Sequence, residues 1–506
     1  MSSVPVTRHN PLPSVAILAA GGFALLVGVI AGGGAAAAGA LVFVVATLLA
    51  YGQSTRSIVT WPNALLVFVA VLWFVPIKLY SLPVNLPFEL ELYRVLILLL
   101  AAGLVINSIA NKRPIEAYSA SKPLFVLAAA ALASQIVNAR TTSAVGTDNQ
   151  ALKSLSLLLS LIVVFLLFAS TLDRFKDIEL IAAALVIGGA IVAIAALYEG
   201  RTSFNVFNQL GSWLPGFERN EREVLELRGG RLRVQASSQH PIALGAAFMM
   251  LMPFALYFIA GARTRLTQAV WVVGLVLLVG GAAATVSRTT VAMGLTMGIV
   301  AFFVRRAAVV KLLPLLLVLP LFVHTAAPGA IGGLVKSLKG EGDVSLIESL
   351  NSRAGEPGSG RLADVSPAYE LWKGSPIVGI GLDDPHLGIS GGDTPPAAEG
   401  SDPIVPIIFD NQYLYTIVAL GLLGFVALIW FVWGTARQLL RSAKTMTDRP
   451  GDFVAACGIA CAGYGASMLF YDSLAFIQVT LLLFVFAALG LRTRALAQRG
   501  TSTAAP

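Results

Sequence analysis

Ile407-Ile408-Phe409-Asp410-Asn411-Gln412-Tyr413-Leu414 joins the longest polar segment of this sequence to a strongly apolar run. The polar segment, 328–411, concentrates Asp, Glu, Gly and Pro residues, and apolar runs flank it on both sides. A polar segment of this kind in a membrane protein carries the chemistry or covers the residues that do, because function concentrates in loops held by a rigid scaffold. We therefore expect the functional site at the face of the bilayer where this junction lies.

The composition identifies a membrane protein. Of the 506 residues, 57% are hydrophobic and only 12% are charged, and the mean hydropathy is +0.80. A soluble chain of this length needs far more charge on its surface. Apolar runs of about 17–22 residues recur, each long enough to cross a hydrocarbon core of about 30 Å. The net charge of +8 does not indicate a nucleic-acid partner, because Lys and Arg lie mainly in short loops between these runs.

We predict an all-α polytopic membrane protein with about fourteen transmembrane helices and two long extracytoplasmic loops. The first apolar run could imitate a signal peptide, but a second run follows almost at once, so both are interpreted as uncleaved spans. The expected spans are 14–30, 35–50, 64–76, 92–109, 123–137, 152–172, 178–197, 241–259, 269–284, 290–304, 312–323, 411–432, 453–470 and 473–491.

Basic residues set the expected orientation through the positive-inside rule. They are concentrated in alternate loops, and placing those loops in the cytoplasm puts the N-terminus there too. We therefore expect a multi-pass protein of the plasma (inner) membrane with an extracytoplasmic site. The expected divisions are an N-terminal transmembrane bundle (1–198), a first extracytoplasmic loop (199–239), central transmembrane helices (240–324), a large extracytoplasmic loop (325–409), C-terminal transmembrane helices (410–491) and a cytoplasmic tail (492–506).

Two stretches on the expected outer face offer cations to an anionic ligand. Most of the charged patch 218–233 can pair with itself, but no acid follows Arg231 and Arg233 before the next span begins at His240. Arg288 lies between two apolar spans with almost no loop and no acid nearby in the sequence. It could be a snorkelling anchor at a helix end, or a fixed cation that binds phosphate beside hydroxyl groups and a helix N-terminus.

The large loop contributes further candidates. Arg361 precedes an expected short helix that contains Trp372, and a glycine-permitted turn follows at 376–381. The Gly-x-Gly in this turn does not fit a dinucleotide fingerprint, which requires a preceding strand and a third glycine. At the end of the loop, Asp410 could cap the next helix. Alternatively, its carboxylate could take a proton from a sugar hydroxyl.

Four local patterns carry a family resemblance: Ser287-Arg288; Arg361…Trp372…Pro376-x-x-Gly379-x-Gly381; Asp410-Asn411…Leu414…Gly421-Leu422-Leu423-Gly424; and, more loosely, Arg233…His240-Pro241. Their order, spacing and outer-face placement resemble the O-antigen ligase and polymerase superfamily. These integral-membrane enzymes have a GT-C-like architecture and handle polyprenyl-diphosphate-linked glycans. The resemblance covers roughly residues 230–425.

The resemblance implies a donor glycan on a polyprenyl diphosphate and an acceptor that is a glycan, a lipid or a protein side chain. Arg288 and Arg361 would hold the diphosphate, and Asp410 would act on the acceptor hydroxyl. Transfer would need no metal and no other cofactor, and the substrates would reach the site from the membrane lipid. The expected substrate-binding residues are Arg233, Arg231, His240, Asn411, Trp372 and His386.

The chain departs from the family at Asp410, where many members have a histidine before the asparagine. Asp410 could replace that histidine as a carboxylate base, or His386 or His240 could do its work. The missing histidine favours a polymerase over an O-antigen ligase.

The expected function is therefore glycan transfer at the outer leaflet during cell-surface polysaccharide assembly. The alternative is a transporter, such as a lipid-linked-oligosaccharide flippase, which can have a similar number of spans. A transporter favours an internal repeat and charged residues along a path within its spans. The sequence shows no repeat between its halves and few charges deep within its spans, which is evidence against a transporter. A structural scaffold would leave Arg288 and the organised loop without a role.

The orientation can be tested with topology reporters. Reporters fused after Glu226 and after Gly340 should both give the non-cytoplasmic signal, and one after Lys444 should give the cytoplasmic signal. Four expected spans lie between the first two fusion sites. Opposite signals from these fusions would contradict the fourteen-span topology, most directly at 312–323, the shortest of the four.

Overall fold

Long apolar helices form almost all of the regular structure. The computed structural model describes residues 60–83, 89–112, 114–116, 118–145, 148–213, 218–220, 227–228, 231–307, 309–310, 364–382, 384, 386–388 and 407–502. The longer helices are α3 (Trp61–Phe74), α4 (Leu92–Asn111), α5 (Ser121–Val145), α6 (Asp148–Thr171), α7 (Phe175–Thr202), α9 (Pro241–Gly261), α10 (Arg265–Ala284), α11 (Arg288–Val304), α16 (Gln412–Ile429), α17 (Thr435–Thr445), α18 (Arg449–Ser467) and α19 (Ile477–Ser502).

Short elements lie between these helices. They are β1 (Tyr80–Ser81), η1 (Val206–Gln209), α8 (Leu210–Trp213), β2 (Glu218–Arg219), β3 (Leu227–Arg228), β4 (Arg231–Leu232), α15 (Val365–Trp372), β5 (Leu387–Gly388), β6 (Ile407–Ile408), a π-helical turn η2 (Trp430–Gly434) and η3 (Ser473–Ala475). β1 pairs with β2 and β3 with β4 in antiparallel fashion, whereas β5 and β6 are parallel.

The all-α polytopic class is confirmed by the helices that the structure describes. Eight of them are long and apolar enough to cross a membrane, and two further apolar helices, α3 and α11, have 14 and 17 residues. The expected spans at 14–30, 35–50 and 312–323 lie outside the described residues. The total of about fourteen spans therefore stays a prediction.

The helix that follows the large loop is longer than the expected span 411–432. α16, η2 and α17 follow one another without an intervening loop and span 34 residues, Gln412–Thr445, with a break inside α16 at Gly421. The sequence suggested a cytoplasmic loop after residue 432 because Arg and Lys residues appear there. These residues share α17 with Ala436, Leu439 and Ala443, which are buried, so the helix continues as an amphipathic one.

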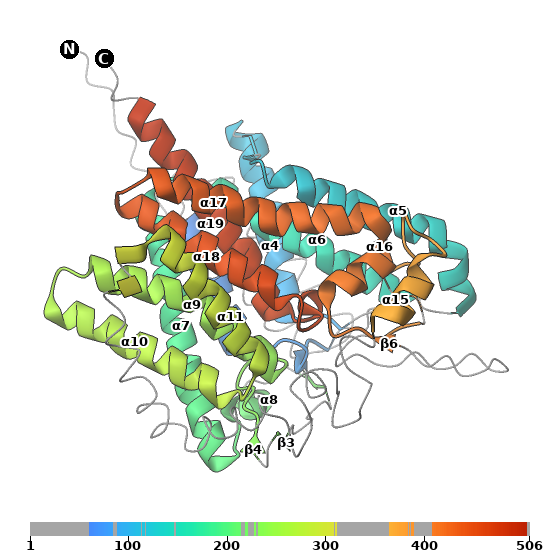
Figure 1. The fold of residues 1–506 in the computed structure, drawn as a ribbon, viewed down its shortest axis with the longest axis horizontal. Helices are drawn as coiled ribbons and strands as arrows, with labels where there is room; N and C mark the ends of the chain where they lie inside the picture. The colour runs from blue at the N-terminus through green and yellow to red at the C-terminus, as the bar shows by residue number, and fades with distance from the viewer. Residues whose placement is uncertain are drawn as a thin grey trace, which may run out of the picture.

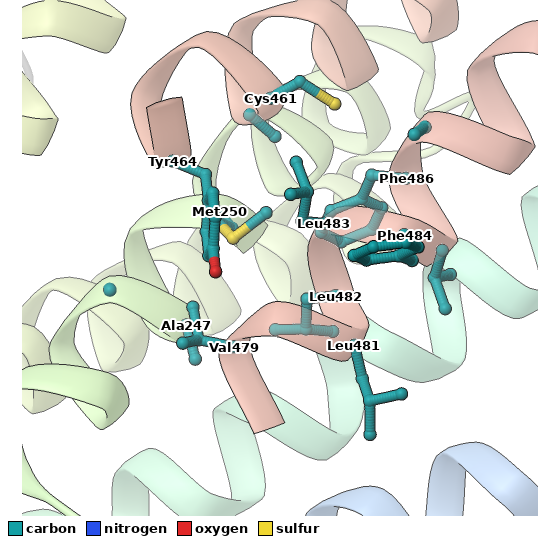
Figure 2. Close-up of a cluster of buried hydrophobic side chains, with 14 of the residues drawn as sticks. Ala247, Met250, Cys461, Tyr464, Val479, Leu481, Leu482, Leu483, Phe484 and Phe486 are labelled. Atoms are coloured by element: carbon teal, nitrogen blue, oxygen red, sulfur yellow. The ribbon is translucent and has the colours of Figure 1, made fainter. Parts of the chain in front are cut away.

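α19 is the central helix of the bundle. Of its apolar window 83% is buried, against 22% for α4, which lies at the periphery. Figure 2 shows Val479 to Phe486 of α19 packed against Ala247 and Met250 of α9 and against Cys461 and Tyr464 of α18. Phe254 of α9 stacks on Phe486 with ring centroids 4.3 Å apart. The last described helix thus supplies the core against which earlier helices pack.

Small residues let α18 approach its neighbours closely. A Cβ atom added to Gly463 would lie 2.4 Å from a carbon of Met297 in α11, and the Cβ that Gly490 of α19 lacks would lie 2.8 Å from Cys457. In a bilayer the apolar effect does not draw helices together, so dispersion contacts between closely spaced backbones carry the association. Cys457 and Cys461 are fully buried in this packing.

The two ends of the bundle differ in character. Figure 1 shows α8, β3, β4, α15 and β6 along one side, while the end of α19 projects from the other. On the latter side, the buried Arg492 donates to the Leu172 carbonyl oxygen at 2.6 Å and to carboxylates of Glu116 and Asp173 at 3.1 and 2.9 Å. Burial would raise the pKa of Glu116, but hydrogen bonds from Arg499 and Arg492 lower it below its usual value.

α16 is broken at Gly421, and the turn Pro376–Gly381 fills the break. Gly421 has φ 64° and ψ −167°, which no helix can accommodate. The turn donates from Ile380 and Gly381 to the carbonyl oxygens of Val418 and Ala419, both at 3.0 Å. It accepts from the next two residues after the break, since the N–H of Leu422 donates to Pro376 at 2.9 Å and that of Leu423 to Ile377 at 3.3 Å. Turn and helix thus satisfy each other's backbone groups.

Both glycine positions are required by this exchange. Gly379 has φ 73°, and a Cβ there would lie 2.3 Å from the Ala419 carbonyl oxygen; a Cβ on Gly421 would lie 2.3 Å from the Ile377 backbone. α5 supports the turn, because Asn138 donates to the Gly379 carbonyl oxygen at 3.1 Å and Ser134 to that of Ala419 at 2.9 Å. The two glycine motifs of the sequence therefore form one structural unit.

Replacing Gly379 with alanine tests this unit. A Cβ forced into a left-handed conformation costs about 1–2 kcal/mol, and the backbone clash adds to it, so Gly379→Ala should lower the melting temperature of the purified protein clearly. Gly298→Ala is the matched control, because a Cβ on Gly298 in α11 meets nothing within 4 Å. Equal melting temperatures for the two variants would contradict the described fit.

Candidate functional site

A tight turn before α9 places Arg233. Glu199, buried at the end of α7, accepts hydrogen bonds from the backbone N–H groups of Gln235 at 3.2 Å and Ala236 at 2.7 Å. Asn205 donates to the Ala236 carbonyl oxygen at 2.9 Å and holds the other side of the turn. With the turn fixed in this way, the buried Arg233 donates from Nε to the carbonyl oxygen of Thr285 at 3.4 Å.

The turn between α10 and α11 places Arg288 as the first residue of α11. Ser287 is the N-cap residue, and Val286 before it has a positive φ of 47°. The turn can approach α9 because Gly245 has no side chain, and a Cβ there would lie 2.2 Å from Thr290 Oγ1 and 2.8 Å from Thr285 Oγ1. Arg288 thus lies at the start of a 17-residue helix, whose partial positive charge favours an anion.

Two of the predicted cations are therefore brought to one place. Arg233 contacts the same α10–α11 turn that carries Arg288, although 55 positions separate them in the sequence. Buried residues that carry a hydroxyl group lie close to the two arginines in the sequence, among them Ser237, Ser287 and Thr290. Paired guanidinium groups beside hydroxyls and a helix N-terminus suit an oxyanion such as phosphate. The side chain of Arg231 and all of Arg361 lie outside the described residues, so their predicted roles remain predictions.

At the start of α16, the capping interpretation of Asp410 is wrong. Asn411 is the N-cap residue, and its side-chain oxygen accepts from the N–H groups of Tyr413 at 2.9 Å and Leu414 at 3.3 Å. Asp410 is half-buried one residue earlier, and its own N–H donates to the carboxylate of the buried Asp364 at 3.3 Å. Either residue type can cap a helix, so the sequence did not distinguish them.

Trp372 and His386 are both held by local contacts. The Trp372 Nε1 donates to the Pro376 carbonyl oxygen at 3.1 Å and so fixes the start of the turn that occupies the break in α16. The exposed His386 ring lies 2.6 Å, Nδ1 to Oδ1, from Asp384. The His386 carbonyl oxygen accepts from the Ile407 N–H at 2.9 Å, which brings it to the β5–β6 pair before Asp410.

His240 belongs to the arginine side of the site. Its Nδ1 accepts from the Ile242 N–H at 3.1 Å as the N-cap of α9, and its ring packs against Phe476 with centroids 5.1 Å apart. Phe476 directly follows η3, the short helical turn between α18 and α19. The contact links the α9 turn to the C-terminal helices.

Two glutamines hold η3 between the arginines and Asp410, a feature that the sequence analysis missed. Gln239 donates to the Ala475 carbonyl oxygen at 2.8 Å and accepts from the Ile477 N–H at 3.2 Å. On the other side, Gln412 accepts from the Leu474 N–H at 2.8 Å. Each glutamine is adjacent in sequence to a predicted site residue, Gln239 to His240 and Gln412 to Asn411. Their position shortly before a long apolar run is the signal that could have identified them, because an amide that enters the bundle needs a partner.

A cavity of about 180 Å³ lies beside η3 and was also missed. Its wall comes from the start of α4 and the loop before it, from α5, α6 and α16, from Leu382 and Leu387, and from the η3 segment. Glu91 and Arg94 form a buried ion pair in this wall, with Nε and Oε2 3.2 Å apart, and the Glu91 carboxylate also accepts from the Lys78 N–H. Asp472, which is 3% exposed, lies at the η3 end.

Metal ligands do not gather in the described part of the chain, where no group of three or more His, Cys, Asp or Glu residues could hold an ion. The chemistry that the described residues offer is electrostatic and acid–base. Two arginines and a helix N-terminus can bind an anion, and carboxylates at Asp410, Asp364 and Asp472 can accept protons or hydrogen bonds.

The O-antigen ligase family model matches residues 273–429, which include the second half of α10, all of α11 and α16, Arg361, Trp372, the 376–381 turn and Asp410. No curated protein matches the chain. The matched segment contains three of the four patterns on which the resemblance rested, and only the looser Arg233…His240-Pro241 pattern falls before it. Residues 273–429 thus carry a segment similar to the O-antigen ligase family, which supports the resemblance to the O-antigen ligase and polymerase superfamily.

Proposed function

We propose that this protein transfers a glycan from a polyprenyl-diphosphate carrier to an acceptor hydroxyl at the outer leaflet of the inner membrane. The observation that carries the proposal is the convergence of Arg233 and Arg288 at the α10–α11 turn, beside and within the segment that matches the O-antigen ligase family. A diphosphate is the anion in such a reaction that needs two cations in fixed positions.

The arginines would act on the leaving group. When the bond between the sugar and the diphosphate breaks, negative charge develops on the bridging phosphate oxygen, and guanidinium groups held in a largely buried site stabilise it without reorganising. Arg361 would join them from the large loop. The partial positive charge at the start of α11 adds to the same effect.

Asp410 would act on the acceptor. Its carboxylate is half-buried at the end of the large loop, and Asn411, not Asp410, caps α16, so the role we assign to Asp410 is proton transfer rather than capping. The acceptor hydroxyl would lose its proton to Asp410 as its oxygen attacks the anomeric carbon. Because Asp410 replaces the usual family histidine, we favour a polymerase over an O-antigen ligase.

The clamp is tested by Arg288→Lys. Lysine keeps the charge but loses the planar fork that grips phosphate oxygens in pairs, so glycan transfer should fall nearly as far as in Arg288→Ala. Transfer is measured with purified protein and lipid-linked glycan, at equal protein levels in the membrane. Arg219→Lys is the control, because Arg219 is an exposed arginine in β2. Full activity in Arg288→Lys would indicate that Arg288 only anchors the helix end and that other residues bind the diphosphate.

The base is tested by Asp410→Asn. Asparagine cannot accept a proton, so the rate of transfer should fall by about 10²–10⁴, while donor binding changes little. Asp410→His should retain partial activity, because imidazole can accept the proton and restores the more usual family pair beside Asn411. Asn411→Ala shows what loss of the helix cap alone does to stability, about 1 kcal/mol, and its melting temperature, not its transfer rate, is the comparison for Asp410→Asn. Wild-type turnover in Asp410→Asn would rule out the assignment and leave His386 and His240 to be tested.

A further inference from the structure

The cavity beside η3 differs in charge from the arginine side of the site. Its wall holds three basic side chains and three acidic ones, Lys78, Arg94, Lys153, Glu89, Glu91 and Asp472, so the formal charges balance. Arg94 is also occupied within the wall, by Glu91 and by Ser156, to which its Nη1 donates at 3.1 Å. A diphosphate would meet carboxylates as well as cations here and would gain little. The charges favour a neutral ligand that has many hydrogen-bonding groups.

The size of the cavity limits the ligand to about one ring. An apolar cavity of about 150 Å³ admits benzene, so 180 Å³ has room for a single six-membered ring. Leucines of α5, α6 and α16 also line the cavity, and Tyr415 is held by a hydrogen bond from its hydroxyl to the Leu382 carbonyl oxygen at 2.5 Å. A ring with hydroxyls at its edge and an apolar C–H face matches this combination of polar and apolar side chains.

The cavity is also joined to the proposed catalytic residues. Gln412 lies in its wall and is two positions after Asp410, and its side chain is fixed by the Leu474 N–H and by Thr416 Oγ1 at 3.0 Å. Asp472 and Leu474 belong to the η3 segment, whose other side is held by Gln239 next to His240. The cavity wall and the Gln239–His240 segment therefore share the same short piece of chain.

We propose that this cavity binds one sugar ring of the acceptor glycan. The assignment rests on the proposed glycosyl transfer and names the place of its second substrate. Carboxylates of the wall accept hydrogen bonds from the ring hydroxyls, and amide N–H groups of the wall donate to them. The leucines pack against the C–H face of the ring. The phosphate-bearing donor and the neutral acceptor are thus separated by the charge of their two sites.

Cysteine protection tests the proposal in the full chain, reconstituted in lipid nanodiscs. Ser154→Cys places a thiol in the cavity wall, and Ser143→Cys places one on the exposed end of α5 outside it. The native Cys457 and Cys461 are buried, so they give little background labelling. The probes are oligosaccharides released by acid from the host's own surface polysaccharide, and inorganic diphosphate. At about ten times the half-protecting concentration, oligosaccharide should slow maleimide labelling at Ser154→Cys about tenfold and leave Ser143→Cys unchanged.

Several results would overturn the assignment. If oligosaccharide protects neither thiol, or protects both equally, the cavity is not a sugar site. If diphosphate protects Ser154→Cys, the cavity binds the donor instead of the acceptor. Lys153→Gln and Asp472→Asn, each added to Ser154→Cys, should raise the half-protecting concentration severalfold. Lys153 is partly exposed, so Lys153→Gln keeps the test valid even where Asp472→Asn does not fold.

Glycosyl transfer by the wild-type protein is assayed in parallel, so the two proposals fail separately. Protection at Ser154→Cys without any transfer would refute the proposed function and leave the cavity as a glycan site. Transfer without protection would refute the sugar site in the cavity and leave the proposed function in place.

Discussion

The structure depends on an exchange of backbone hydrogen bonds between two segments that are both incomplete alone. α16 is interrupted at Gly421, and the turn Pro376–Gly381 supplies the donors and acceptors that the interruption leaves over. In a hydrocarbon environment each unsatisfied backbone group costs several kcal/mol. Neither segment could therefore be buried in the membrane without the hydrogen bonds that the other supplies. Because the exchange fixes one end of the large loop on a membrane helix, it also fixes Leu382 and Leu387 at the cavity and limits where Asp410 can lie.

A second connection, made by side-chain amides, joins the two halves of the site. Gln239 and Gln412 bind the backbone of the η3 segment from different sides, and η3 in turn begins α19. The segment between Arg233 and α9, the start of α16 and the core of the bundle therefore meet at one short piece of chain. A displacement of η3 would move the Gln239–His240 segment and the start of α16 together, and with them the residues that we propose to act on donor and acceptor.

The sequence predicted the features that are local and failed on those that need distant partners. Hydropathy placed the helices well, because apolar length is a property of each segment alone. The position of Arg288 at a helix junction was correct for the same reason. The pairing of the 376–381 turn with Gly421, by contrast, joins residues some forty positions apart. The cavity wall combines Lys78 and Arg94 with residues of α6 and α16, which no local pattern connects. The cap is Asn411 rather than Asp410, whose N–H donates to the distant Asp364.

The central position of α19 has a consequence for biosynthesis. The helix that forms the core leaves the ribosome after all the other described helices, and until it arrives α9 and α18 lack one of the partners against which they pack (Figure 2). Gln478 donates to the Leu72 carbonyl oxygen at 2.8 Å and Arg492 to that of Leu172, so these hydrogen bonds to the first described helices also form only then. The packing of the bundle core is therefore completed late in translation. A chain that stops short of α19 would leave those surfaces open to the lipid and to quality-control proteases.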